Sequence, residues 1–255
     1  MNATHRDLVF TRYTKEGITD ETSCIALEIE STLWVNGEEW LSFRCSPDAL
    51  DTLAAGFLFN EMIIQSKEEI SSITVSKNDQ TIDVWLTHSA QKPLTWNRTS
   101  GCTAGVSAVN SISQMGELSK PIVPIAEIYF ALEQHLDELK NCGERMNGAH
   151  ISVLVKGEQL LSTSLDIGRH NTLDKIAGDC LLRGITASGA TLVTTGRISA
   201  DMVFKAAAMG VPQLISLHSA SSLAVDLAQE LGMILISHAH RPRMDILTGT
   251  ERLKY

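Results

Sequence analysis

The chain of 255 residues lacks several features that mark particular classes of protein. No apolar run approaches the roughly 18 residues that a membrane-spanning helix needs. The first residues, MNATHRDLVFTRYTKEG, contain no apolar segment of the kind found in secretory signals. Basic residues are outnumbered, with 21 lysines and arginines against 30 acidic residues. We therefore expect a cytoplasmic protein with neither membrane nor nucleic acid as a partner, since affinity for the phosphate backbone comes mainly from lysine and arginine.

Closely spaced cysteines are also missing. The five cysteines lie far apart, and no C-x-x-C occurs. An odd count in a chain without a visible secretory signal disfavours a disulfide framework. The absence of paired ligands disfavours a structural zinc site, and the H-x-E and P-C-x-x-C motifs of zinc deaminases do not occur. We expect no metal site. Each cysteine is predicted to be either a core residue or a thiol with a chemical role.

What is present is an ordinary globular composition, with 44% hydrophobic and 20% charged residues,. Asn36–Gly37 is a strong hairpin signal within residues 25–45. A helix is predicted to follow, with Ser46 as its N-cap and Pro47 in its first turn. The remaining predictions for a first, α+β part, residues 1–145, are strands over 70–76 and 81–88 and a helix over 124–140.

The second part, residues 146–255, has a clearer pattern. A hairpin over 150–166 is followed by a helix over 169–184, whose apolar face includes Cys180 and makes that cysteine a core residue. Strands then alternate with helices: strands over 190–196, 212–218 and 233–239, and helices over 199–210 and 221–232. Short connections between them predict two βαβ units and a parallel sheet, and thus an α/β fold.

Ligands of open parallel sheets bind beyond the carboxyl ends of the strands, where three loops are predicted: 194–199, 218–222 and 237–245. Ser199 and Ser221 are expected to cap helices whose N-termini suit phosphate. Arginine binds phosphate through two parallel hydrogen bonds. These loops predict an anionic, phosphorylated ligand, with a solvated basic surface as an equal alternative. The candidate residues are Thr195, Gly196, Arg197, Ser199, His218, Ser219, His238, His240, Arg241 and Arg243.

The stretch DIGRHN, residues 166–171, is a second dense polar group. Asp166, Arg169, His170 and Asn171 are candidates for an acid–base set. His170 is the side chain expected to titrate near neutral pH or to lower the pKa of a nearby thiol. A purely structural histidine is the alternative interpretation.

Cys102 lies in RTSGCTAG, residues 98–105, where no bulky neighbour shields it. The residues alone leave three interpretations of this thiol: a nucleophile, half of a metal site, or a small core residue.

Taken together, these motifs resemble the FdhD/NarQ family of formate dehydrogenase accessory proteins. The resemblance runs from about Ile25 to Thr248 and is carried, in the family's order, by VNGEEW, CSPDALDTLAAGFLFNEMI, RTSGC, DIGRHNTLDKIAG, TTGRISADMVFKAAAMGVP and SSLAVDLAQELG. The most specific motif is GRHN-x-x-DK, Gly168 to Lys175.

The resemblance implies a sulfur carrier that acts as a sulfurtransferase. Cys102 takes sulfur from a cysteine desulfurase as a persulfide. It then passes the sulfur to the molybdenum bis(molybdopterin guanine dinucleotide) cofactor, Mo-bis(MGD), of formate dehydrogenase. The resemblance also implies that the segment from His238 to Arg243, with Ala239 and Pro242, contacts the guanine nucleotide part of that cofactor. It further implies a homodimer, and a second part with the α/β/α sandwich of cytidine deaminases, without their zinc.

The chain departs from the family pattern at a few positions. Gly105 replaces a second loop cysteine, and Met62 stands where glycine is usual in a turn. His238, His240 and Asp245 replace an aromatic residue, an arginine and an asparagine. Two other functions stay open: an enzyme that uses Cys102 as a hydrolytic or deaminating nucleophile, and a non-catalytic chaperone that binds the cofactor or the apo-enzyme.

Overall fold

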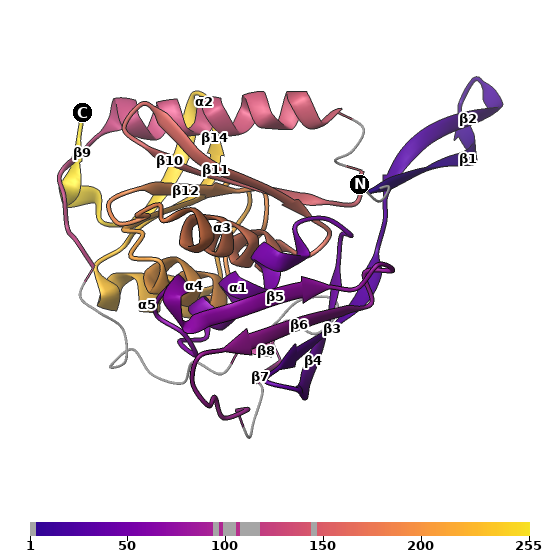
Figure 1. The fold of residues 1–255 in the computed structure, drawn as a ribbon. Helices are drawn as coiled ribbons and strands as arrows, with labels where there is room; N and C mark the ends of the chain where they lie inside the picture. The colour runs from indigo at the N-terminus through magenta and orange to yellow at the C-terminus, as the bar shows by residue number, and fades with distance from the viewer. Residues whose placement is uncertain (1–3, 94–96, 99–105, 108–117, 144–146) are drawn as a thin grey trace.

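The computed structural model describes residues 4–93, 97–98, 106–107, 118–143 and 147–255 (Figure 1). The predictions for Cys102 and Gly105 therefore lie outside the described residues.

The first part contains a four-stranded sheet, in the order β4-β3-β6-β5. The predicted hairpin is confirmed as β3 (Ile29–Val35) and β4 (Glu38–Cys45). Asn36 and Gly37 both have positive φ, 51° and 80°, as a two-residue hairpin turn of this type requires,. Strands β5 (Ile70–Val75) and β6 (Thr81–Leu86) are also confirmed, and a short 3₁₀ turn, η1 (Lys67–Glu69), leads into β5.

Two predictions for this part are wrong. Helix α1 runs over Leu50–Asn60 and does not begin at Ser46, because Ser46 bonds to the second part instead: its N–H donates to Asp166 and its hydroxyl accepts from the N–H of Ile167. Residues 25–28 do not belong to the β3–β4 hairpin. Residues up to Ala26 form a separate hairpin, β1 (His5–Thr14) and β2 (Gly17–Ala26), which projects from the body (Figure 1).

The second sheet has six strands in the order β11-β10-β12-β13-β14-β15. The predicted hairpin is β10 (His150–Lys156) and β11 (Gln159–Asp166). The predicted parallel strands are β12 (Thr191–Thr194), β13 (Gln213–Ser216) and β14 (Ile234–His240). An unpredicted strand, β15 (Arg243–Thr248), pairs antiparallel with β14 at the edge.

Helices cover both faces of this sheet. Helix α2 (Ile125–Cys142) lies on one face, where Ile128 and Leu132 pack with Val153, Val193 and Ile215. On the other face lie α3 (Arg169–Arg183), α4 (Ala200–Ala208) and α5 (Ser222–Leu231), with Leu154, Leu192 and Leu214 among the residues they cover. The α/β class and the three layers are confirmed. Short pairs complete the strands: β7 (Asn97–Arg98) with β8 (Val106–Ser107), and β9 (Val123–Pro124) with β16 (Leu253–Lys254), which follows η4 (Thr250–Arg252).

Helices α1 and α3 join the two sheets through a contact between glycines. A Cβ on Gly56 would stand 1.7 Å from the carbonyl oxygen of Asp174, and one on Gly178 would stand 1.9 Å from that of Thr52. Only glycine permits this approach of the two backbones. The contact lies in the middle of α3 and holds that helix against α1.

Candidate functional site at the carboxyl edge of the sheet

The loops that follow β12, β13 and β14 lie side by side. The N–H of Ile198 donates to the carbonyl of Ser219 at 3.0 Å, and the N–H of Ser221 donates back to Ile198 at 2.9 Å. The N–H of His238 donates to the carbonyl of His218 at 3.1 Å. The structure therefore brings together the candidate residues of all three predicted loops.

Buried hydroxyl groups fix the turns of the first two loops. Thr194 Oγ1 accepts from the N–H of Gly196 at 3.1 Å, and Ser216 Oγ donates to the carbonyl of Gly196 at 2.6 Å. Ser216 Oγ also accepts from the N–H of His218 at 2.9 Å. These side chains hold the loop backbone in place, so that Gly196 and His218 have fixed positions at the edge.

The two helices that leave these loops begin differently. Ser221 caps α5 as predicted, since its hydroxyl accepts from the N–H of Ala224. Ser199 occupies the N-cap position of α4 as predicted, but its side chain makes no capping hydrogen bond. Its hydroxyl instead lies 3.2 Å from Nε2 of His170. The side chain of Ser199 thus connects the first loop to the start of α3.

Arg169 lies across Gly196. A Cβ on Gly196 would stand 2.7 Å from Cβ and 3.0 Å from Cδ of Arg169, so the glycine makes room for the arginine stem. His150 and His218 are close enough to interact electrostatically with each other, and His150 with Arg169 as well. Burial, followed by the charges of Arg169 and His218, lowers the pKa of His150. The edge therefore gathers a permanent positive charge and two imidazoles.

His150 was not among the predicted residues. Its Nδ1 lies 3.1 Å from Oγ1 of Thr195, and this hydroxyl accepts a hydrogen bond from the N–H of Ile151. The signal for it is topological: β10 runs antiparallel to β12, so the first residue of β10 reaches the carboxyl edge of β12.

The four predicted residues of DIGRHN do not form one set. The carboxylate of Asp166 is fully buried and accepts from the N–H of Ser46, the N–H of Gly168 and Nδ2 of Asn171, at 2.8 to 3.0 Å. It also pairs with Lys175 at 2.7 Å. Asp166 and Asn171 thus tie α3 to the first part of the chain, whereas Arg169 and His170 face the loops.

The last two residues of GRHN-x-x-DK are engaged in buried ion pairs. Lys175 bridges Asp166 and Asp48. Asp174 pairs with Lys205 of α4, at 2.6 Å between Oδ1 and Nζ. These pairs hold α3 in place, which accounts for the motif's charged end without a role in ligand binding.

The third predicted loop is a hairpin. His238 and His240 lie in β14, Arg243 begins β15, and the turn contains a cis peptide bond between Arg241 and Pro242. His238 and His240 are exposed and Ala239 is buried, and this alternation is the strand signal that the dense charge obscured.

Acidic residues partly neutralise this hairpin. Arg241 pairs with Glu133 and lies over the ring of Tyr129, 5.0 Å from its centre, both on α2. His238 Nδ1 lies 3.1 Å from Asp245, which also contacts Arg243 at 3.4 Å. Arg241 is therefore held against α2, whereas His238 and Arg243 share one carboxylate, so the net positive charge of the hairpin is smaller than the sequence suggests.

Comparison with known proteins identifies the family. The family model described as FdhD/NarQ matches residues 26–254. The chain belongs to the FdhD/NarQ family. It is 32% identical over 251 residues to the sulfur carrier protein FdhD of Bacillus pumilus, covering 96% of each chain. It is 30% identical over 250 residues to that of Bacillus licheniformis, covering 96% of this chain and 95% of the relative.

A solved structure of the same kind shares the fold. The crystal structure of a protein from Desulfotalea psychrophila, assigned as a formate dehydrogenase accessory protein, matches 99% of this chain and 100% of its own. The TM-score is 0.80 at 25% sequence identity. The chain is an α/β protein, as the resemblance to the FdhD/NarQ family implied. Among the described helices, none is long and apolar enough to cross a membrane.

Two of the cysteines in this FdhD/NarQ chain are poor nucleophiles. Cys45 and Cys180 are buried, the latter as predicted. Burial raises the pKa of Cys45 to about 12 and that of Cys180 to about 11. Because the thiolate is the reactive species, neither is suited to attack a persulfide at neutral pH. Cys24 lies in the projecting hairpin and Cys142 at the end of α2.

Proposed function

We propose that this protein is a sulfur carrier in the maturation of formate dehydrogenase, with Cys102 as the carrier residue. The observation that carries the proposal is the FdhD/NarQ match over residues 26–254, which spans the Cys102 loop, to relatives named as sulfur carrier proteins. The raised pKa values of Cys45 and Cys180 support it by removing two competing thiols. A cysteine desulfurase is the donor, and Mo-bis(MGD) is the substrate that receives the sulfur.

Loading is a thiol exchange at sulfur. The Cys102 thiolate attacks the terminal sulfur of the desulfurase persulfide, an S–S bond forms on Cys102, and the desulfurase cysteine leaves as a thiolate. Small neighbours on both sides of Cys102 allow a second protein to approach closely. One cysteine in this loop suffices for the exchange, so the glycine at position 105 does not block it.

The carboxyl edge of the sheet is the proposed docking site for a guanine nucleotide end of the cofactor. Arg169 supplies a permanent charge for a phosphate, with His150 and His218 beside it. The N-termini of α4 and α5 open toward the same loops, and helix N-termini favour anions. The chemistry of these groups fits a diphosphate, with Arg243 of the β14–β15 hairpin as a further cation.

Several finer features stay predictions. These are the homodimer, the cytoplasmic location, association with the formate dehydrogenase catalytic subunit, and the likeness of residues 146–255 to cytidine deaminases. None is needed for the loading step.

The test is the intact mass of the protein after incubation with a cysteine desulfurase and cysteine. We expect a gain of one sulfur atom that Cys102→Ala abolishes and that a reducing agent removes. The Cys45→Ala and Cys180→Ala variants are matched controls and should load as the unaltered protein does. A gain of sulfur that persists in Cys102→Ala would overturn the assignment.

A further inference from the structure

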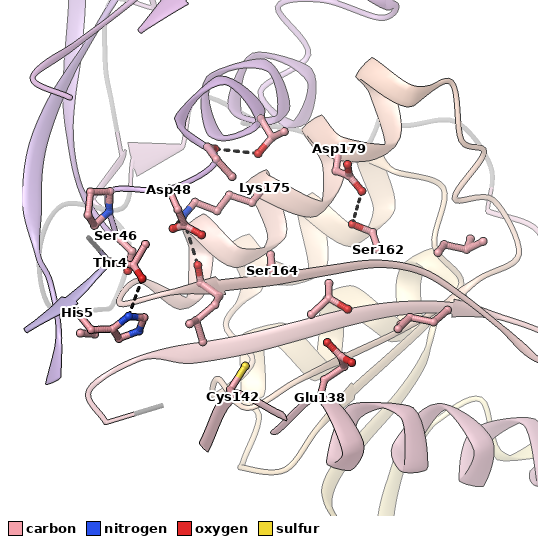
Figure 2. Close-up of a pocket in the computed structure, with 18 of the residues that line it drawn as sticks. Thr4, His5, Ser46, Asp48, Glu138, Cys142, Ser162, Ser164, Lys175 and Asp179 are labelled. Atoms are coloured by element: carbon pink, nitrogen blue, oxygen red, sulfur yellow. Dashed lines mark hydrogen bonds and ion pairs between the residues drawn. The ribbon is translucent and has the colours of Figure 1, made fainter. Parts of the chain in front are cut away.

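A cavity of about 1020 Å³ lies along β11, apart from the carboxyl-edge site. Figure 2 shows β11 running between two walls. Ser162 and Ser164 point toward α3 on one side, and Glu138 and Cys142 of α2 line the other. His5, at the base of the projecting hairpin, lines it as well. The cavity has the form of a groove with an edge strand along its floor.

The backbone of β11 presents hydrogen-bonding groups to this groove. Ile151 of β10 turns toward β12, because its carbonyl accepts from the N–H of Thr195. Its partner Leu165 must therefore turn its N–H and carbonyl away from β10, and so must Thr163, two residues earlier in the strand,. β11 is the edge strand of the six-stranded sheet among the described residues.

Charged side chains cover both ends of this edge and leave its middle open. Nζ of Lys175 donates to the carbonyl of Leu165 at 3.3 Å, and Nη1 of Arg183 donates to that of Leu161 at 3.2 Å. Charged residues of this kind protect edge strands from unwanted pairing. Thr163 lies between them, exposed, and its outward N–H and carbonyl face no neighbouring strand in the described part of the chain.

The walls of the groove carry net negative charge. Lys175 is shared by two carboxylates, Asp48 and Asp166, so that this trio has an excess of one negative charge. Arg183 and Asp179 neutralise each other. Glu138 adds a further carboxylate on the α2 side. An extended segment with basic side chains therefore complements both the open backbone and the charge of the groove.

We propose that this groove binds an extended, basic segment of a partner polypeptide, which pairs its backbone with β11 at Thr163. Strand addition to an exposed edge takes its affinity from backbone hydrogen bonds and its specificity from the flanking side chains. Here the N–H and carbonyl of Thr163 form the backbone pairs, and Asp48 and Glu138 receive the basic side chains. The proposal does not involve Cys102, so it stands independently of sulfur transfer.

The experiment measures binding of three fluorescein-labelled probes to the full chain by anisotropy. The first is a nine-residue peptide in which pairs of adjacent lysines are separated by single threonines, so that lysine side chains point to both walls of the groove. The second has glutamate in place of lysine, and the third is the lysine peptide with its alternate amides N-methylated, which prevents strand pairing. We expect only the first to bind. Hydrogen exchange at the amides of Thr163 and Leu165 should slow when it binds.

Two pairs of variants separate pairing from charge. Thr163→Pro removes the outward N–H without breaking a bond to β10, and Thr163→Val retains that N–H. We expect Thr163→Pro to weaken binding at least about tenfold and Thr163→Val to leave it unchanged. Glu138→Gln, on the surface of α2, should weaken binding severalfold without affecting the fold, whereas Glu133→Gln, away from the groove, should not.

The proposal fails if the lysine peptide does not bind at about 1 mM, a concentration that detects even weak peptide sites. It also fails if the N-methylated or acidic peptide binds equally well. If the free protein already protects the amide of Thr163 and light scattering shows a dimer that Thr163→Pro dissociates, the occupant is a second copy of this chain and the proposal is wrong.

Discussion

The start of helix α3 has two sides that use similar residues for opposite purposes. On one side, every oxygen of Asp166 is engaged, by Lys175, Asn171 and backbone N–H groups of both parts of the chain. On the other side, Arg169 and His170 lie against the loops of the sheet's carboxyl edge. A buried, saturated carboxylate stabilises the fold and has no capacity left for a ligand. Arg169 instead brings a permanent positive charge to the loops, beside the N-termini of α4 and α5, where an anion is favoured,.

The largest effect on stability is expected from removing the negative charge of Asp166, which pairs with Lys175. Asp166→Asn leaves Lys175 buried with Asp48 as its remaining carboxylate, and the free energy of unfolding should fall by about 3 kcal/mol. Denaturant titration followed by circular dichroism measures it. The double variant Asp166→Asn, Lys175→Met should recover part of the loss, since no buried charge then lacks its partner. A double variant that loses the sum of both single losses would contradict this account.

The opposite pattern is expected on the side of α3 that faces the loops, where a substitution should weaken ligand binding and leave stability nearly unchanged. Arg169→Ala should weaken binding of guanosine diphosphate about 10- to 100-fold, the effect of losing charged hydrogen bonds to phosphate. Its free energy of unfolding should change by less than about 1 kcal/mol. Isothermal titration calorimetry measures the affinity, and Arg183→Ala, at the far end of the same helix, is the control that should bind normally. Unchanged affinity in Arg169→Ala would remove the arginine from the site.

The smallest effect concerns the buried histidines. Burial, with the charges of Lys205 and Arg169, lowers the pKa of His170 to about 3, and burial lowers that of His135 to about 4. Both imidazoles are neutral in the folded state, whereas in the unfolded chain they take up protons below about pH 6.5. Stability is therefore complete above pH 6.5 and falls as the pH decreases, because the unfolded state binds more protons.

Between pH 6.5 and 5.5, protonation of each histidine in the unfolded chain should lower the free energy of unfolding by about 1 kcal/mol. His170→Gln and His135→Gln should each reduce the slope of unfolding free energy against pH by a similar amount, although only His170 borders the site. Urea titrations at both pH values test this. If only one of the two variants changes the slope, the other histidine does not have a lowered pKa in the folded state and the prediction for it is wrong.

Local patterns were sufficient to predict most of the fold. Asn36–Gly37 predicted the β3–β4 hairpin because few other dipeptides accept positive φ at both positions,. The alternation after residue 190 predicted the parallel strands, because βαβ units have few other arrangements,. The start of α1 could not be predicted, since the partner of Ser46 is Asp166, far along the chain.

The candidate site was predicted less completely. The convergence of the loops follows from the parallel sheet, but His150 enters it only through the antiparallel pairing of β10 with β12. The charge of Arg241 in the sequence gave no sign that Glu133 on α2 would neutralise it. The division of DIGRHN into two sides depends on which neighbour each side chain meets, and those neighbours come from other elements.

The glycine contact between α1 and α3 has a consequence for how the chain folds during synthesis. Gly56 and Gly178, like Ser46 and Asp166, which are 120 residues apart, meet only after the second part has been made. Contacts this distant in sequence slow folding because a long loop must close first. Until α3 leaves the ribosome, the face of α1 that will receive it stays uncovered, so the nascent first part passes through a stage at which it is prone to aggregate.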